Sequence, residues 1–319
     1  MFKFSFFNNK FKSSKSIHKK GIIIINNVYQ SKYNYNRSNC TGLGDFIRGC
    51  YFMLEFCDKF NFQPKIIFNN CISKFLNIKT HNLHLIDNLL KSIDFFKNNN
   101  FKEYNIQNSI ILDPFKDNNQ VTKDFINYIC DSPTYYGNVF LFCNSYPINN
   151  VIPEKHKQFI RRMLEPTTEM INIVKKVLKE NELINRQYSV IHIRSGDAYL
   201  KNKNNTYFDN KYIAKLIDNI KADITDTNKK YLIIADNNQI KLLLKQHFSY
   251  LNFIIITNDI THFGEGVELE EEKVKNTLID FYLLSESKDI ISYSCYKHGS
   301  GFSYWCAKTF NIPYLCKYI

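Results

Sequence analysis

The sequence lacks any long hydrophobic run. No stretch among its 319 residues approaches the roughly 18 consecutive apolar residues that a membrane-spanning helix needs. The first segment, Met1 to Lys20, mixes phenylalanine with lysine and has no uninterrupted apolar core of the kind found in a secretory signal. We therefore expect a soluble, cytoplasmic protein without a membrane span.

Metal-binding and redox motifs are absent too. The sequence has no Asp-x-Asp, no His-x-x-x-His and no EF-hand loop, and its 9 cysteines include no Cys-x-x-Cys pair. Cys50, Cys57 and Cys306 fall at apolar positions of expected helices, which indicates small buried side chains in a reducing compartment. We expect no metal ion and no cofactor.

Glycine, proline and arginine are scarce, and the charge is carried by lysine. The net charge of +12 taken alone suggests a polyanionic partner, but the lysines are scattered through the chain, so we expect a basic solvated surface and no nucleic-acid partner. Where lysine is the usual cation, an arginine indicates a need for a rigid bidentate donor, as in phosphate recognition. Arg48 and Arg194 both lie in motifs described below.

Hydrophobic residues make up 44% of the chain and aromatic residues 15%, which supplies a sizeable core and excludes global disorder. After Asn185, apolar β-branched runs alternate with helical patterns. The expected strands are 188–194, 231–236, 253–257, 289–293 and 312–315, and the expected helices are 209–221, 238–246, 272–287 and 301–309. This alternation indicates a parallel, doubly wound sheet that binds its ligand beyond the carboxyl ends of the strands.

The N-terminal half begins with a βαβ pattern and then becomes hard to interpret. The expected strands are 21–25 and 64–68, with a helix over 46–60 that Thr41 or Asp45 can cap. Residues 70–150 yield one helix at 83–97, and a further helix is expected at 167–181. We therefore predict an α/β chain with an N-terminal domain over 1–160, a linker region over 161–186 and a C-terminal domain over 187–319.

The segment His192-Ile-Arg-Ser-Gly-Asp197 ends the first strand of the C-terminal half. Residues two apart on a strand share a face, so His192 and Arg194 point the same way. Gly196 permits close backbone approach, and a guanidinium at the carboxyl end of a parallel strand suits a diphosphate. The alternative is a surface arginine paired with Asp197.

Three other segments carry polar groups to expected strand or helix ends. Gly42-Leu-Gly44-Asp45 opens a helix, and Asp45 shares a helical face with Arg48, which suits either a catalytic base or an N-cap with an ion pair. Asp236 ends a strand and either begins a turn or contacts a nucleotide. His298-Gly-Ser-Gly-Phe-Ser303 precedes a helix and is either a cap or a phosphate cradle.

The order of these motifs resembles the fucosyltransferase superfamily, which includes α1,2-, α1,6- and protein O-fucosyltransferases. The matching segments are Gly-Leu-Gly-Asp-Phe-Ile-Arg-Gly, His-Ile-Arg-Ser-Gly-Asp, Ile-Ile-Ala-Asp, Asp-Phe-Tyr-Leu-Leu-Ser-Glu-Ser-Lys-Asp-Ile-Ile and Gly-Phe-Ser-Tyr-Trp, within 40–60 and 165–315. One departure is Ser195, which stands where the α1,2 and α1,6 groups carry a second arginine. The resemblance implies a GT-B-like fold: two Rossmann-like doubly wound domains facing a cleft, with a GDP-sugar donor and no metal.

Carried over by position, the resemblance assigns Arg194 to the diphosphate, and His192 and Asp236 to the guanosine. Asp45 and Arg194 are the candidate catalytic residues. The candidate donor-binding residues are Gly42, Gly44, Arg48, His192, Gly196, Asp197, Asp236, Ser300, Gly301, Phe302 and Ser303.

These expectations describe an inverting, metal-independent glycosyltransferase that moves a sugar, fucose from GDP-fucose, onto a hydroxyl of a glycan or protein acceptor. Two alternatives remain open. One is a GT-B glycosyltransferase that uses another nucleotide sugar. The other is a non-catalytic glycan- or nucleotide-binding protein with the same fold.

Overall fold

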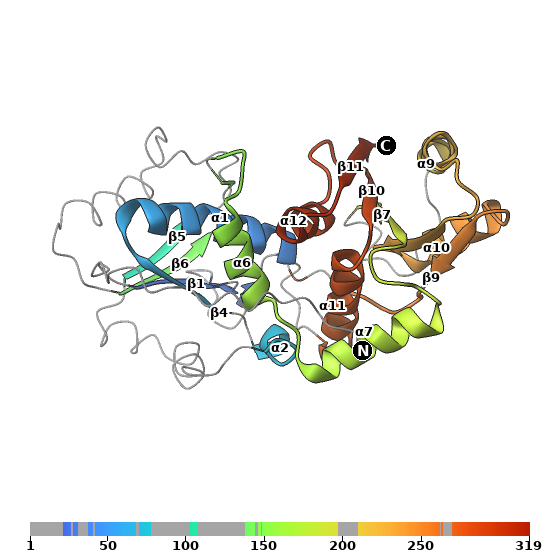
Figure 1. Cartoon of the computed structure of the whole chain (residues 1–319). Coiled ribbons are helices and arrows are strands. Elements are labelled where there is room, and N and C mark those ends of the chain that lie inside the picture. The colour runs from blue at the N-terminus through green and yellow to red at the C-terminus, as the bar shows by residue number, and fades with distance from the viewer. Residues whose placement is uncertain are drawn as a thin grey trace.

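The computed structural model describes residues 22–26, 28–30, 38–40, 42–67, 70–77, 102–106, 138–143, 146–147, 149–196, 210–261, 263 and 270–319. The helix expected at 83–97 and the candidate residue Asp197 lie outside these residues. The described chain forms two α/β halves, with helices α1 and α12 meeting between them (Figure 1).

The C-terminal half contains a five-stranded sheet in the order β11-β10-β7-β8-β9, in which all neighbouring strands are parallel. Its strands are β7 Ser189–Arg194, β8 Lys230–Ala235, β9 Asn252–Ile255, β10 Asp289–Ser294 and β11 Tyr314–Tyr318. Its helices are α9 Asn210–Asp223, α10 Asn238–His247, α11 Glu271–Ser285 and α12 Gly301–Phe310. The chain runs outward from β7 to β9 and then returns to the other side of β7, so the switch point lies between β7 and β10.

The N-terminal half contains a parallel four-stranded sheet in the order β4-β1-β6-β5 and a small antiparallel hairpin. The sheet strands are β1 Ile22–Asn26, β4 Gln63–Ile67, β5 Lys102–Ile106 and β6 Asn138–Cys143, and the hairpin strands are β2 Val28–Gln30 and β3 Ser38–Cys40. Its helices are α1 Leu43–Phe60 and the short α2 Asn70–Ser73. Helix α1 packs on this sheet and points its N-terminus toward the C-terminal half (Figure 1).

Helix α1 begins earlier than the sequence predicted. The helix starts at Leu43 with Gly42 as its N-cap, and no side chain caps it. Asp45 therefore lies inside the first turn, so the prediction that Asp45 can cap the helix is wrong. Leu43 is apolar and buried, so the apolar face of the helix begins one turn before Phe46.

Two helices connect the halves. Helix α6, Glu154–Met163, was not expected and packs against α12 and α1, while α7, Thr168–Glu180, packs against α11. The expected helix at 167–181 corresponds to α7, which is capped by the Thr167 hydroxyl accepting a 3.3 Å hydrogen bond from the amide of Met170.

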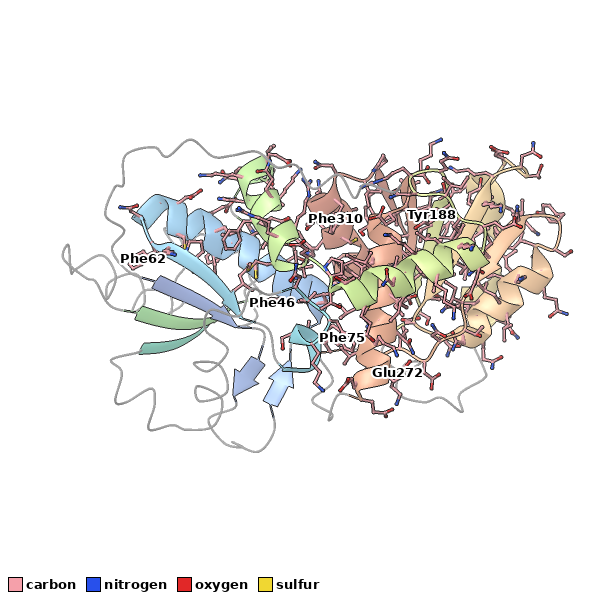
Figure 2. All side chains as sticks on the ribbon, turned by 60° about the horizontal axis from the view of Figure 1, so that its bottom comes forward. Phe46, Phe62, Phe75, Tyr188, Glu272 and Phe310 are labelled. Carbon is pink, nitrogen blue, oxygen red and sulfur yellow. The ribbon has the colours of Figure 1, made fainter. Side chains whose placement is uncertain are left out.

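One apolar core crosses the boundary between the halves. It joins residues of α1, such as Phe46, to Phe75 after α2 and to residues of α7, α11 and α12, and Figure 2 shows Phe46 and Phe75 between the two lobes. A buried 2.8 Å hydrogen bond between Tyr51 and Thr309 also links α1 to α12. A second cluster, which includes Phe248, fills the outer side of the C-terminal half.

Cys50, Cys57 and Cys306 are buried thiols that form no disulfide with the described residues, as their apolar positions predicted. Within the described part of the chain, no helix is both long and apolar enough to span a bilayer.

Candidate functional site

A cavity of about 320 Å³ lies where the two halves meet, at the carboxyl ends of β7 and β8. This volume falls in the range of small-molecule sites. Of the sequence candidates, Gly42, Gly44, Asp45, His192, Arg194, Asp236, Ser300, Gly301 and Phe302 line it. Residues separated by more than 250 positions thus meet at the switch point of the C-terminal sheet, where a doubly wound fold binds its ligand.

Arg194 enters the cavity from the end of β7 and is fixed by Asp236 at the end of β8. Its Nη1 donates a 2.7 Å hydrogen bond to Asp236 Oδ2, and both side chains are largely buried. The guanidinium also lies 5.7 Å from the ring centroid of Tyr296. A buried, oriented arginine of this kind is ready to bind an anion without further ordering.

The carboxylate of Asp236 also holds the turn that follows β7. It accepts hydrogen bonds of 2.9 and 3.0 Å from the amide of Ser195, one of 3.1 Å from the amide of Gly196, and one from the Ser195 hydroxyl. Gly196 adopts a φ of 119°, which an L side chain rarely tolerates, so this turn requires glycine. The sequence allowed Asp236 to begin a turn or to contact a nucleotide. In the structure its carboxylate secures the turn at Ser195 and Gly196, which follows the neighbouring strand β7.

His192 lies one pleat below Arg194 and is 4% exposed. Its Nδ1 is 3.0 Å from the hydroxyl of Ser303 and 3.3 Å from that of Ser292. Burial, together with the positive charges of Arg194 and Lys241, lowers the pKa of His192 to about 3. The imidazole is therefore neutral at physiological pH and lines the cavity as a polar but uncharged group.

Two helix N-termini converge on the cavity. Gly42 caps α1 without a side chain, and the Ser300 hydroxyl makes no capping hydrogen bond to α12. The first amides of a helix lack intrahelical acceptors and carry the positive end of its dipole, so each of these ends favours an anion. A Cβ on Gly44 would lie 2.2 Å from the backbone carbon of Gly301, which shows how closely the two helices approach.

Asp45 stands at the rim of the cavity in the first turn of α1. Its side chain is 42% exposed, and its Oδ1 forms an ion pair with Arg48 Nη1 at 3.1 Å. The Arg48 guanidinium also stacks 4.3 Å from the ring centroid of Tyr146. The carboxylate is therefore both accessible from the cavity and oriented by a neighbouring cation.

Asp280, in the middle of α11, also lines the cavity and was not among the sequence candidates. Burial raises the pKa of Asp280 to about 6, and the positive charge of Lys241 opposes this rise. The signal for this site was an aspartate between Ile279 and Phe281, within an otherwise apolar helical run. A buried carboxylate in a cavity is a common sign of a binding group.

Three candidates take other positions. Arg48 and Gly196 stand beside the cavity rather than in its lining, and Ser303 lies beneath it, fully buried against His192 and Tyr314. Within the described residues, no group of three or more histidine, cysteine or acidic side chains is arranged to hold a metal ion.

Comparison with known proteins places the fold. No protein-family model matches the sequence, and no curated protein matches it. A FUT1 mutant from Arabidopsis thaliana in complex with GDP superposes with a TM-score of 0.52 at 10% identity, over 94% of this chain and 71% of the other. The α-1,6-fucosyltransferase NodZ soaked with GDP-fucose gives 0.51 at 14% identity, over 91% and 93%. At these identities the similarity establishes the GT-B fold of these fucosyltransferases, as the sequence motifs predicted.

Proposed function

We propose that this protein is an inverting, metal-independent glycosyltransferase that transfers a sugar, with fucose from GDP-fucose preferred, onto a hydroxyl group of a glycan or protein acceptor. The observation that carries the proposal is the convergence of Arg194 and two helix N-termini on one cavity, because all three favour a bound anion. GDP in the similar FUT1 structure and GDP-fucose in that of NodZ support the choice of donor.

The diphosphate of the donor binds at Arg194 and at the amides that begin α12. A guanidinium donates two parallel hydrogen bonds to phosphate oxygens, and Asp236 already holds it in place. Preorganised donors of this kind stabilise the negative charge that develops on the leaving diphosphate, and each is worth roughly 3–4 kcal/mol in the transition state. These residues supply the charge stabilisation for which other transferases use a metal ion.

The nucleobase binds deeper, against Asp280 and His192. Guanine presents two neighbouring N–H groups on its Watson–Crick edge, and an ionised carboxylate accepts both. The neutral imidazole of His192 and the ring of Phe302, whose centroids are 6.1 Å apart, complete this end of the cavity. Uracil and thymine present one such N–H group, so this arrangement favours a guanine nucleotide.

Asp45 is the proposed general base. As the acceptor oxygen attacks the anomeric carbon, the bond from that carbon to the diphosphate oxygen breaks, and the acceptor proton passes to the Asp45 carboxylate. Attack from the face opposite the leaving group inverts the anomeric configuration. The transition state resembles the oxocarbenium ion of glycoside hydrolysis.

A thermal-shift titration with GDP, UDP, dTDP, GDP-fucose and GDP-mannose, with and without EDTA, tests the donor. We expect stabilisation by GDP and GDP-fucose that EDTA leaves unchanged, since bound ligand raises the apparent unfolding temperature. Stabilisation by UDP or dTDP alone would keep a glycosyltransferase but exclude GDP-fucose. No response to any nucleotide would favour a non-catalytic glycan-binding protein.

Two substitutions separate binding from chemistry. We expect Arg194→Ala to abolish nucleotide binding, because the diphosphate loses its fixed cation. We expect Asp45→Asn to retain nucleotide binding and to lose transfer by roughly 100-fold or more, the usual contribution of a general base. Full transfer activity in Asp45→Asn would contradict the assignment of the base.

A further inference from the structure

Lys241 on α10 is a buried cation that the proposed chemistry does not use. Its side chain is 1% exposed, and its Nζ donates a 2.7 Å hydrogen bond to the carbonyl oxygen of Ile256, just after β9. Burying an ammonium group is costly unless compensating charges lie nearby. The presence of lysine at this position therefore needs a physical reason.

Two carboxylates supply that compensation, and both line the cavity. Burial lowers the pKa of Lys241, and the negative charges of Asp280 on α11 and Asp236 after β8 oppose that shift. In return, Lys241 is the charged group that opposes the upward shift of the Asp280 pKa. Lys241 also acts on His192 of β7, together with Arg194. The positive charge of Lys241 thus acts on both residues, His192 and Asp280, that are proposed to contact the nucleobase.

Lys241 influences Asp280 without occupying its oxygen atoms. The segment after β9, whose first residue Lys241 contacts, packs against the face of α11 that carries Asp280. One turn before Asp280, Asn276 Nδ2 donates a 2.9 Å hydrogen bond to the carbonyl of Asp259, and the Thr277 hydroxyl donates one of 3.1 Å to the carbonyl of Thr261. Within the described residues no hydrogen bond joins Lys241 to Asp280, whose carboxylate lines the cavity, because the ammonium donates to the Ile256 carbonyl. Both oxygens of Asp280 are consequently available to a ligand in the cavity.

We propose that Lys241 is a positioning residue for the donor: its buried ammonium holds Asp280 in the ionised form that accepts the two N–H groups of guanine. The inference rests on the proposed function, because it assumes that a guanine nucleotide occupies the cavity. Hydrogen bonds to a charged acceptor are stronger than those to a neutral one, and a protonated Asp280 accepts fewer of them.

The test is the pH dependence of GDP affinity, measured by calorimetry for wild type, Lys241→Met and Lys241→Gln. Glutamine keeps a donor for the Ile256 carbonyl but carries no charge, so it separates the electrostatic role from the hydrogen bond. Without the cation, the Asp280 carboxyl protonates at higher pH. We therefore expect both variants to bind GDP about tenfold more weakly than wild type near pH 6 and almost equally near pH 9.

The ratio of variant to wild-type affinity is the quantity to compare, because the terminal phosphate of GDP also titrates near pH 6 and cancels in that ratio. Asp280→Asn provides the second control. In this background the Lys241→Gln substitution should change GDP affinity by the same factor at every pH, since the group it acts on no longer titrates.

The outcomes distinguish the two proposals. Wild-type protein that binds no GDP at any pH contradicts the proposed function and with it the role of Lys241. Two outcomes leave the donor assignment intact and assign Lys241 a structural role. In one, the ratio of variant to wild-type GDP affinity is constant across pH; in the other, Lys241→Gln binds GDP as tightly as wild type at every pH and only Lys241→Met binds more weakly. Should Lys241→Met fail to fold by circular dichroism, Lys241→Gln decides between these outcomes.

Discussion

The imidazole of His192 contributes to the acid sensitivity of the fold. Its pKa lies near 3 in the folded protein because of burial and two nearby cations, against 6.5 in the unfolded chain. Below about pH 6.5 the unfolded state binds a proton that the folded state does not, so the free energy of unfolding falls as pH decreases. At about pH 5 this loss amounts to roughly 2 kcal/mol.

We expect His192→Gln to reduce this fall in the free energy of unfolding at acidic pH. The variant is less stable than wild type at neutral pH, because its contacts with Ser292 and Ser303 are lost, but its stability should change less between pH 7 and pH 5. Urea unfolding at both pH values measures the difference. The exposed His247 on α10 offers a matched histidine-to-glutamine control. If the free energy of unfolding of His192→Gln falls between pH 7 and pH 5 as much as that of wild type, this explanation is contradicted.

At the residue scale, the sequence predicted the polar groups that follow strands or begin α1 and α12, and it missed two charged groups on α10 and α11. Arg194 and Asp236 were accessible to prediction because both end β-branched runs, where the carboxyl ends of parallel strands meet. Asp280 lies within α11 and Lys241 within α10, and both helices carry other charged residues, so charge alone does not distinguish these two in the local sequence. Their proximity depends on how the two helices pack on the sheet, which no local pattern specifies.

Helices α1 and α12 meet at Gly44, and this contact closes the cavity. A Cβ at this position would lie 2.2 and 2.4 Å from the backbone carbon and oxygen of Gly301. We therefore expect Gly44→Ala to lower the free energy of unfolding by roughly 1–3 kcal/mol, the usual cost of overpacking, and to weaken nucleotide binding as the helices separate. Denaturant unfolding and GDP titration measure the two effects.

Gly301→Ala is the matched control for that contact. Its Cβ would lie 3.4 Å from Asp45 Oδ1, an ordinary contact with the end of a side chain. This variant should therefore unfold at nearly the wild-type denaturant concentration. If Gly44→Ala proves as stable as Gly301→Ala, the helices are free to separate and the close approach does not constrain the site.

At the element scale, the C-terminal half was predictable and the N-terminal half largely was not. Strands such as β7 and β8 are largely apolar runs that are buried on both faces, the usual pattern in a parallel sheet. Strand β5, Lys-Glu-Tyr-Asn-Ile, has no such pattern, and the apolar run of β6 is too short to distinguish strand from helix. Helix α6 was missed because only His156 and Ile160 are buried along its length.

The two halves share one apolar core, so we expect the described chain to unfold as one cooperative unit. The core joins α1 of the N-terminal half to α7, α11 and α12, and the hydrogen bond from Arg161 Nε to the Thr309 carbonyl, 2.6 Å long, adds a polar link. Residues of one contiguous core lose their packing together, whereas independent domains are joined by smaller and more polar interfaces.

Hydrogen exchange of two reciprocal variants tests this expectation. Phe46→Leu in the shared core and Phe248→Leu in the outer cluster each remove a fully buried ring and should cost roughly 1–3 kcal/mol. If folding is cooperative, Phe46→Leu lowers the protection of amides in β7 and β10, and Phe248→Leu lowers that of amides in α1, by similar factors. Loss of protection confined to the half that carries the substitution would show that the halves unfold separately. In that case α1 closes the donor cavity only while the interface is formed, and nucleotide affinity should fall in Phe46→Leu but not in Phe248→Leu.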